Sequence, residues 1–420
     1  MCAISEGMPL LLSRPALGVW LIAVVASLTA PRPLPAADWP EFRGPSGQGY
    51  SGDTGAPLSW NESENIAWKT PLPGRGWSSP VIAGNEVWLT VSNDRGRSLR
   101  AISLDAGTGQ MRHDVEVFRF ERPPAIHEKN SYASPTPIIE GGRVYVHFGM
   151  LGTAALTRDG KLLWENQQLR YQHGHGPGGS PALSGDLLII NCDGTDVQYV
   201  AALDKDTGAL RWQTDRPSAR MAFSTPLVID AGDSRQVVSV GGDRAVSYDL
   251  ETGEELWWIR FHGFSGVPRP VFGHGLVYLT TGFYNPEVIA VRPDGRGDVT
   301  SSHIAWQSSR GAPLTPSPLL VGEELYFVSD RGIATCLDAK TGRQHWQARF
   351  RGAFSASPVY ADGRIYFLNE SGETSVIAAG QEFKKLAQNQ LGTKTLASIA
   401  VSGAAIFLRT ESHLYRIEEK

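Results

Sequence analysis

The sequence predicts an all-β protein, an eight-bladed β-propeller of four-stranded antiparallel blades whose ring is closed by an N-terminal strand. Two repeated patterns predict this fold. A hairpin pattern recurs eight times along the 420 residues, and a turn motif that ends in tryptophan follows several of its copies. The 46 glycines and 27 prolines are typical of a chain with many tight turns. No long segment has helical periodicity, so we expect no large helical domain.

The first element is an export signal, expected over residues 1–37. Arg14 precedes an apolar run at residues 16–29, which is too short for a comfortable membrane span and is followed by a Pro- and Ala-rich segment. We expect cleavage near Ala37, with Ala30 as a second option and an uncleaved anchor as the alternative. The mature chain is then periplasmic or extracellular, with no membrane span.

An N-terminal extension, residues 38–63, precedes the propeller, which we expect over residues 64–420. The last repeat ends at residues 413–420 and is one strand short, whereas residues 65–70 are a spare strand that contains Trp68. We therefore expect residues 65–70 to form the outer strand of the eighth blade. This pairing removes the edge that an open ring would expose.

Each hairpin unit begins with a pair of residues that leads into a short apolar strand, followed by a Gly-containing turn and a second apolar strand. In most units this pair is a small residue followed by proline. The repeated positions are Pro80, Pro137, Pro181, Pro226, Pro270, Pro318, Pro358 and Ile399. Their spacing of roughly 40 to 57 residues matches four-stranded propeller blades.

The second recurrent element is the turn motif at residues 202–212, 247–257 and 336–346. An Asp accepts hydrogen bonds from the turn amides, Thr-Gly reverses the chain, and the final Trp packs against a neighbouring blade. Residues 103–113 keep the motif with His113 in place of Trp. The tryptophans expected to dock between blades are Trp68, Trp164, Trp212, Trp257, Trp306 and Trp346.

This motif, A-x-D-x-x-T-G-x-x-x-W, resembles the docking motif of the pyrroloquinoline-quinone (PQQ) repeat propellers, and the resemblance covers about residues 64–420. That superfamily includes eight-bladed quinoprotein alcohol dehydrogenases and the propeller component of the bacterial outer-membrane barrel-assembly machine. Residues 38–49 and 64–80 also resemble secreted PQQ-like propeller proteins of Planctomycetes-type bacteria.

The resemblance makes PQQ and calcium conceivable cofactors, but features of the PQQ dehydrogenases are missing. Those enzymes carry a disulfide of adjacent cysteines, whereas Cys192 and Cys336 lie in different repeats here. Their calcium ligands and catalytic aspartate have no counterpart that we can place. We therefore expect no cofactor, no metal site and no catalytic residue.

Residues 172–186, QHGHGPGGSPALSGD, suggest two other sites. His173 and His175 are spaced like a metal pair, but no third His or Cys lies near in sequence. The glycines match a dinucleotide loop, but a Pro-started strand follows where that loop needs a helix. We interpret the stretch as the loop into the third blade. Metal ligands from other blades stay an alternative.

The loops that lead into the inner strands gather round the central channel, where propellers usually bind ligands. Arginine and histidine there suit an anionic or hydrogen-bonding ligand, and Trp77, Phe223, Phe264 and Phe354 offer stacking surfaces. The alternative is that these side chains satisfy loop carbonyls or pack between blades. The candidate ligand-binding residues of this rim are Arg75, Trp77, His127, Asn130, His175, Arg220 and Arg269.

The sequence carries no nucleophile elbow, Walker loop or HExxH motif, and the net charge of −4 gives no electrostatic argument for nucleic acid. We predict a secreted, non-catalytic, monomeric binding or scaffolding module. Its partner would be a protein or a small anionic or saccharide ligand, held at the channel rim. The alternatives are a divergent quinoprotein that oxidises an alcohol or sugar with PQQ and calcium, and a polysaccharide-binding module.

Overall fold

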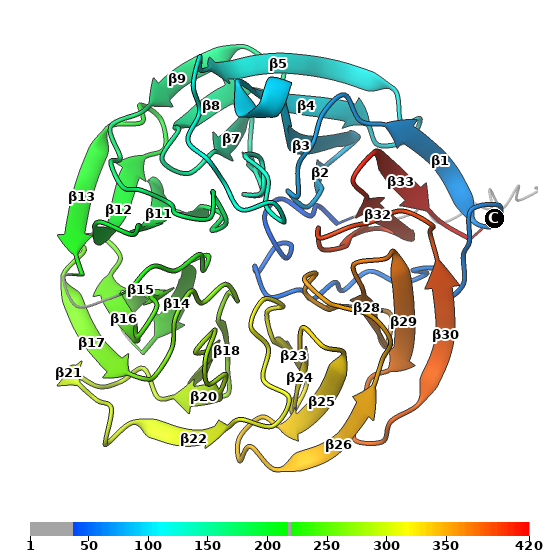
Figure 1. Cartoon of the computed structure of the whole chain (residues 1–420). Coiled ribbons are helices and arrows are strands. Elements are labelled where there is room, and N and C mark those ends of the chain that lie inside the picture. Colours follow the sequence, from blue (N-terminus) through cyan, green and yellow to red (C-terminus); the bar gives the residue numbers. More distant parts are fainter. Residues whose placement is uncertain (1–36, 217–219, 233, 420) are drawn as a thin grey trace, which may run out of the picture. The chain divides into compact units, whose positions relative to one another are not determined.

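The structure, a computed structural model, describes residues 37–216, 220–232 and 234–419. It confirms the predicted all-β, eight-bladed propeller, in which eight antiparallel sheets surround one axis (Figure 1). The export signal expected over residues 1–37 lies, apart from Ala37, outside the described residues. Among the residues described, no helix is long and apolar enough to cross a membrane.

The strands of each blade follow one another from the axis outward. Blades 1 to 4 consist of β2 (Val81–Ala83), β3 (Glu86–Asn93), β4 (Ser98–Asp105) and β5 (Met111–Arg119); β6 (Ile138–Glu140), β7 (Arg143–His147), β8 (Thr153–Thr157) and β9 (Leu162–Asn166); β10 (Ala182–Ser184), β11 (Leu187–Asp193), β12 (Gln198–Asp204) and β13 (Leu210–Asp215); and β14 (Leu227–Ala231), β15 (Ser234–Val240), β16 (Arg244–Asp249) and β17 (Glu255–Arg260).

Blades 5 to 8 repeat this order. They consist of β18 (Val271–Gly273), β19 (Leu276–Thr280), β20 (Val288–Val291) and β22 (Ile304–Ser308); β23 (Leu319–Val321), β24 (Glu324–Val328), β25 (Ile333–Asp338) and β26 (Gln344–Arg349); β27 (Val359–Ala361), β28 (Arg364–Leu368), β29 (Glu373–Ala378) and β30 (Lys385–Gln390); and β31 (Ala400–Ser402), β32 (Ala405–Arg409), β33 (His413–Ile417) and β1 (Ile66–Pro71). A short strand, β21 (Gly297–Asp298), adds to blade 4 in parallel with β17.

The ring closes as predicted, because β1 pairs antiparallel with β33 as the outer strand of blade 8. Trp68 lies opposite Arg416 in this pair. Both side chains donate to the carbonyl of Ala106 in blade 1, Trp68 Nε1 at 3.0 Å and Arg416 Nη1 at 2.9 Å. The two ends of the repeat array are therefore joined by a strand pair and by side-chain hydrogen bonds.

A docked tryptophan and a turn glycine make the contact between neighbouring blades. The indole nitrogens of Trp68, Trp164, Trp212, Trp306 and Trp346 each donate to a backbone carbonyl of the next blade. The Thr-Gly turn of the next blade lies directly against the indole ring: a Cβ on Gly208 would come within 2.4 Å of the Trp164 side chain. That glycine has φ of +71°, so it meets two requirements, a left-handed backbone and a close approach.

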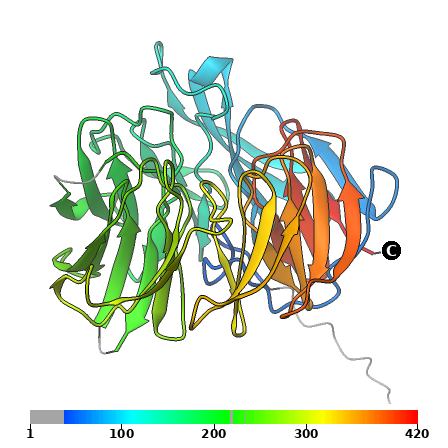
Figure 2. The same ribbon diagram turned by 60° about the horizontal axis from the view of Figure 1, so that its bottom comes forward.

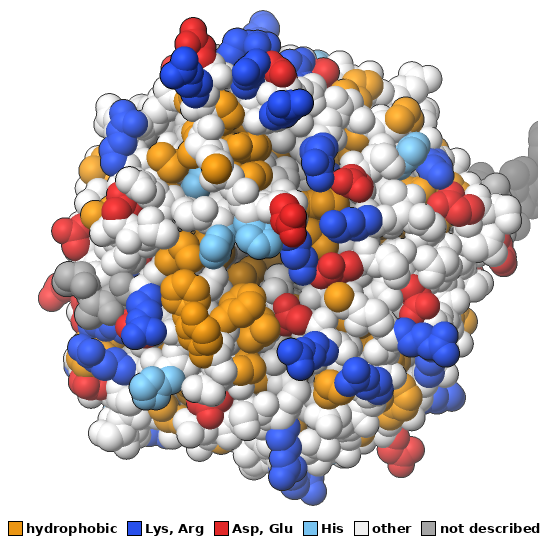
Figure 3. Space-filling view, viewed as in Figure 1, with side chains coloured by type: hydrophobic (Ala, Val, Ile, Leu, Met, Phe, Trp, Pro, Cys, Tyr) orange, Lys and Arg blue, Asp and Glu red, His pale blue; other side chains and the backbone are white. Residues whose placement is uncertain are grey.

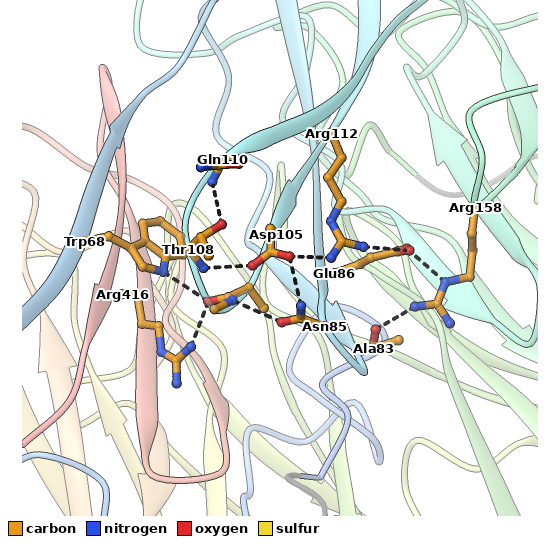
Figure 4. A network of polar contacts seen from close by, with 12 residues as sticks. Trp68, Ala83, Asn85, Glu86, Asp105, Thr108, Gln110, Arg112, Arg158 and Arg416 are labelled. Atoms are coloured by element: carbon orange, nitrogen blue, oxygen red, sulfur yellow. Dashed lines mark hydrogen bonds and ion pairs between the residues drawn. The ribbon is translucent and has the colours of Figure 1, made fainter.

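The turn itself is held as the sequence motif implies. In blade 1, Asp105 accepts from the amide of Thr108 at 2.8 Å and pairs with Arg112, which also reaches Glu86 (Figure 4). These contacts lower the pKa of Asp105 to about 2, mainly through the Arg112 hydrogen bond. The motif therefore fixes both the turn and the edge of the blade that receives Trp68.

Trp257 departs from this arrangement. Its indole nitrogen donates to Oε1 of Gln236 at 3.0 Å inside blade 4, and the side chain is fully buried. Blade 5 carries Pro-Asp-Gly at residues 293–295 where blades 1, 3, 4 and 6 have Asp-x-x-Thr-Gly, and β21 pairs with β17 there. Because the receiving turn differs, the indole of Trp257 forms its hydrogen bond within its own blade, while its cluster of buried residues extends into blade 5.

The N-terminal extension crosses the centre of the ring, where Figure 1 shows it in dark blue. Trp39 pairs with Ile82 of blade 1, and Gly49 accepts from the amide of Tyr360 in blade 7. Trp39 and Trp60 are buried in the same apolar cluster as residues of blades 1, 7 and 8. The extension is thus an integral part of the packed propeller and not a separate tail.

One wall of the ring is raised. Strands β3 to β5 are longer than their counterparts, and Figure 2 shows the light-blue and cyan segments rising above the neighbouring blades. Residues 120–134 descend from this wall to the channel. Tyr132 anchors this loop, because its hydroxyl donates to the carbonyl of Pro124 at 2.7 Å and its ring packs against Gly96 in η1 (Asp94–Gly96). This loop delivers His127, Lys129 and Asn130 to the channel.

Candidate functional site

A cavity of about 640 Å³ occupies the central channel. In the space-filling view down the axis, hydrophobic and histidine side chains gather around the hollow at the centre of the face (Figure 3). Phe42 of the N-terminal extension also lines the cavity. Because the extension crosses the axis, it forms the floor, and the site is a cup that opens on one face of the ring.

Near the floor, a ring of hydroxyl groups surrounds the cavity, contributed by seven of the eight blades. Each comes from the residue before the repeated position, which is a proline in six of these blades and Ile399 in blade 8. We call it the hydroxyl ring, and all its members line the cavity. It consists of Ser79, Thr136, Ser180, Thr225, Ser317, Ser357 and Ser398.

The hydroxyl ring links each blade to the next. The amide of Ser79 donates to Oγ1 of Thr136 at 3.0 Å, and the amide of Thr136 donates to Oγ of Ser180 at 2.9 Å. The same bond recurs from blade 3 to 4, 5 to 6, 6 to 7, 7 to 8 and 8 to 1, at 2.9 to 3.1 Å. Every hydroxyl of the ring is therefore held in place by a backbone amide.

Arg269 takes the fifth position, where a hydroxyl would otherwise stand. Its amide keeps the pattern by donating to Ser317, but its guanidinium turns to the extension and donates to the carbonyl of Phe42 at 2.8 Å. It also lies 3.4 Å from Oε2 of Glu41. A Cβ on Gly47 would come within 2.2 Å of this guanidinium, so a glycine is needed there.

The floor beneath the ring is rich in buried charge. Arg43 is 1% exposed and donates to the carbonyls of Gln48 and Pro318, both at 2.7 Å. Burial, with the charge of Arg269 nearby, lowers the pKa of Arg43 to about 9. Burial also raises the pKa of Glu41, and Arg269 partly opposes that rise. Two guanidinium groups and one carboxyl group therefore lie next to Phe42.

His127 and His175 meet on one side of the mouth. Their rings are perpendicular, with centroids 5.6 Å apart, and the ring of His175 lies 6.1 Å from that of Phe223. Asn130 fixes the two loops: its Nδ2 donates to the carbonyls of His175 and Pro177, at 2.9 and 3.1 Å. Its Oδ1 accepts from Ser131 and Ser134, so the amide of Asn130 positions the loops.

An aromatic wall adjoins the two histidines, with Phe223 next to His175. Phe264 stacks on Tyr284 with ring centroids 5.5 Å apart, and both line the cavity with Phe283 and Phe223. Tyr284 is 77% exposed and has φ of +80°, a strained backbone for a non-glycine residue. The amide of Phe283 donates to the carbonyl of Phe264 at 2.8 Å, which ties the two loops together. The wall therefore presents a fixed apolar surface at the mouth.

An ion pair spans the mouth from the raised wall to blade 7. Nζ of Lys129 lies 2.6 Å from Oε1 of Glu370. The hydroxyl of Ser355 donates to the same carboxylate oxygen at 2.7 Å, and Trp77 donates from its indole nitrogen to the carbonyl of Lys129 at 3.1 Å. Lys129 is thus held over the cavity by blade 7 and by Trp77.

The structure brings four of the seven predicted rim residues to the cavity: Trp77, His127, Asn130 and His175. The other three lie elsewhere. Arg75 is exposed and pairs with Glu411 at 3.1 Å, Arg220 is exposed and lies 3.6 Å from Asp243, and Arg269 is buried against the extension. Phe223 and Phe264 line the cavity, whereas Phe354 is packed between blades 6 and 7.

His173 and His175 have separate environments. His173 is 3% exposed, and burial lowers its pKa to about 4. Within the described ranges, neither of its ring nitrogens has a hydrogen-bond partner. His175 lines the cavity. In the described part of the chain, no group of three or more His, Cys, Asp or Glu side chains could hold a metal ion.

The donor set of the cavity does not fit a calcium-bound quinone. Calcium takes six to eight oxygen ligands, commonly carboxylates, and Asp330 is the one carboxylate among the described residues that line the cavity. Its Oδ2 already accepts from the amides of Leu314 and Thr315, at 2.7 and 3.2 Å. Cys192 and Cys336 are buried, lie in different blades and form no disulfide within the described part of the chain.

Comparisons with known proteins agree with this architecture. The family model described as outer membrane protein assembly factor BamB matches residues 45–195 and 196–420. The chain belongs to this family. The expected resemblance to PQQ-like propellers and to the barrel-assembly component is thereby confirmed.

Individual relatives of this BamB-family chain are distant. Tetrathionate hydrolase from Acidithiobacillus ferrooxidans is 23% identical over 307 residues, covering 66% of this chain and 54% of that protein. The chain thus spans about half the length of this curated relative.

Two solved structures share the fold of this BamB-family chain. BamB from Moraxella catarrhalis superposes with a TM-score of 0.60 at 15% identity, covering 84% of this chain and 97% of that one. The quinohemoprotein alcohol dehydrogenase from Comamonas testosteroni gives a TM-score of 0.66 at 12% identity, covering 91% and 81%. At such identities, the likeness shows the fold alone.

Sequence reasoning missed three features of this BamB-family site. The hydroxyl ring had a signal, the recurrent Ser or Thr before the repeated proline. The bond between Lys129 and Glu370 joins residues 241 positions apart, and no pattern in the sequence indicates it. Phe283 and Tyr284 lie in the turn between β19 and β20, inside a blade, whereas the predicted rim residues belong to the loops between blades.

Proposed function

We propose that this BamB-family chain is an exported, non-catalytic binding module, which holds a ligand or a segment of a protein partner in the cup of its central channel. The observation that carries the proposal is the cup itself, a cavity of about 640 Å³ with a floor made by the extension and a mouth lined by aromatic side chains. Cavities of this size with few fixed polar groups are typical ligand sites.

The rigidity of the wall supports binding. The hydroxyls of the ring are held by backbone amides, Asn130 uses both its amide protons and its oxygen in fixing loops, and Phe264 is stacked on Tyr284. A wall that is already ordered loses little conformational entropy when a ligand enters. The exposed ring of Tyr284 extends the apolar surface onto the rim.

The chemistry of the lining supports a non-catalytic role. Among the described residues, none of the hydroxyls of the ring is hydrogen-bonded to a histidine or a carboxylate that would activate it as a nucleophile. The donor set also disfavours the quinoprotein alternative, because Asp330 is occupied by two amides. Export rests on the pattern of residues 1–37.

A photo-crosslinking experiment tests the proposal. The photoreactive residue p-benzoylphenylalanine replaces Tyr284 at the mouth or, as a control, Leu210, which is 48% exposed on the outer strand β13. After irradiation of cells that produce each variant, intact-mass measurement of the purified protein reports a small-ligand or a protein adduct. We expect a discrete adduct at position 284 that is absent at position 210.

Two results would contradict the proposal. One is the same set of adducts at both positions, which would mean that the mouth binds nothing selectively. The other is turnover: dye reduction with alcohols or sugars after incubation with PQQ and calcium would establish the quinoprotein alternative.

A further inference from the structure

The hydroxyl ring and the floor together define the chemistry of the ligand. We propose that the ring recognises a carboxylate group carried on an apolar body, with the carboxylate deep in the cup and the body against the aromatic wall. This inference rests on the proposed function, since it assigns a ligand class to the same cavity.

The direction of the hydrogen bonds carries the first step. A backbone N–H can only donate, so each hydroxyl oxygen of the ring accepts, and its own proton is free to point elsewhere. Among the described residues, none of these hydroxyls donates a hydrogen bond to a protein acceptor. All of them line the cavity. The ring therefore offers the cavity a set of oriented O–H donors.

The balance of donors and acceptors selects the ligand. A saccharide hydroxyl needs acceptors as well as donors, yet Oδ1 of Asn130 and Oδ2 of Asp330 already accept from protein groups. Among the described lining residues, this leaves Oδ1 of Asp330 as the one carboxylate oxygen without a hydrogen bond, against seven hydroxyl donors of the ring. A surplus of donors matches a ligand group that only accepts. A carboxylate is such a group, and O–H donors to an ionised oxygen form stronger bonds than those between neutral groups.

The arginines beneath the hydroxyl ring carry positive charge, which matches an anionic ligand group. The guanidinium of Arg43 donates to the carbonyl of Pro318, next to Ser317 of the ring, and that of Arg269 donates to the carbonyl of Phe42, with Glu41 as the carboxyl neighbour. Among the described residues, Nε and Nη1 of Arg43 and Nε of Arg269 have no hydrogen-bond partner. In a buried site such charges act with little screening, so an anion near the floor is stabilised.

The upper part of the cup fits an apolar body. Phe223, Phe264 and Val267 line it, together with Leu314 and Leu396. A carboxylate that enters this cup therefore leaves water together with an apolar group, which gains from burial against these side chains.

Matched probes test the class of ligand by isothermal titration calorimetry with the full mature chain. Octanoate is compared with octanol and octylammonium, which keep the body and replace the anionic group. A leucine tripeptide with an acetylated N-terminus is compared as free acid and as amide, which separates a small carboxylic acid from a chain end. We expect one site for octanoate or for the free-acid peptide, and affinity at least tenfold lower for each uncharged or cationic counterpart.

Substitutions of ring threonines test whether the anionic probe binds at the hydroxyl ring. Thr136→Val and Thr225→Val remove two hydroxyls and keep the side-chain shape, and the double variant should weaken binding of the anionic probe at least tenfold. Thr335→Val is the matched control. Thr335 is equally buried and accepts from Gln347, but it does not line the cavity. A thermal melt confirms that each variant is folded.

Three outcomes with these probes and variants would overturn the inference, and a fourth concerns a different ligand. They are equal affinity for octanoate and octanol, no effect of the double variant on binding, and no heat of binding for either carboxylate. A neutral oligosaccharide that binds where the carboxylates do not would also overturn it. Selective adducts at position 284 would then still support the proposed function, so the two failures are distinguishable.

Discussion

The amide nitrogen of Ser398 donates to the hydroxyl of Ser79 at 3.1 Å, across 319 residues of sequence. Blade 8 is thereby joined to blade 1 by the same bond that joins most consecutive blades. Closure of the ring therefore takes place at the axis through the hydroxyl ring and at the perimeter through β1 and β33.

Removal of one hydroxyl of the ring should destabilise the fold. Ser79→Ala leaves the amide of Ser398 without its acceptor in a region that is 5% exposed. An unsatisfied buried donor costs about 1–3 kcal/mol, and urea unfolding measures the loss. Ser301→Ala, on an exposed turn, is the control and should change the free energy of unfolding by less than about 0.5 kcal/mol. Equal midpoints would contradict the prediction.

Gly208→Ala should show what the Thr-Gly turn contributes to docking. Position 208 combines φ of +71° with a Cβ only 2.4 Å from Trp164. Gly185 has φ of +57° and open space around its Cβ, so Gly185→Ala carries the backbone cost alone, roughly 1–2 kcal/mol. We expect the larger loss in unfolding free energy at position 208. A loss no larger than that at position 185 would mean that the contact with Trp164 is easily relaxed.

Acidification should destabilise the protein through two buried histidines. Burial lowers the pKa of His147 to about 3 and that of His173 to about 4, whereas the unfolded value is about 6.5. The unfolded chain therefore takes up protons first as the pH falls, and stability present above pH 6.5 is lost on the way to pH 4. Linkage gives a loss of about 2 kcal/mol per histidine between pH 8 and pH 5.

His173→Leu isolates one of these contributions. Since the ring nitrogens of His173 have no partner, the variant loses no hydrogen bond, and its unfolding free energy should fall by about 2 kcal/mol less than that of the wild type from pH 8 to pH 5. Chemical unfolding at both pH values measures the difference. Parallel pH profiles for variant and wild type would refute the assignment.

Arg269→Met should loosen the N-terminal extension. The change leaves Glu41 near the floor without its cation and removes the hydrogen bond to the carbonyl of Phe42. Breaking a buried pair on one side costs about 3–5 kcal/mol, and limited proteolysis should cut residues 38–63 faster. The double variant Glu41→Gln, Arg269→Met removes the uncompensated charge and should recover part of the protection. An unchanged cleavage rate in Arg269→Met would show that other contacts hold the extension.

The fold could be predicted because its signals are local and repeated. Each blade has its own Gly turns and apolar strands, and a count of strands was enough to assign residues 65–70 to blade 8. The candidate site was harder. Trp77, His127, Asn130 and His175 were found because their loops lead into inner strands, which fixes their place in the ring.

The direction of a side chain within that ring depends on packing partners far along the chain. Arg269 was expected at the mouth, but its guanidinium pairs with Glu41, 228 residues away. Sequence alone gives no sign of that partner, because the extension has no repeat that would place it. Trp257 differs for a related reason, since its environment depends on the turn of the next blade.

The path of the extension has a consequence for folding. Residues 38–63 contact blades 1, 2, 5, 6, 7 and 8, and β1 needs β33 as its partner. No fragment that ends before blade 8 contains all of these partners, so residues 38–63 complete their contacts late, although they are made before the blades. Contacts of such sequence separation slow folding, and we expect the native ring to form only after the whole chain has been synthesised.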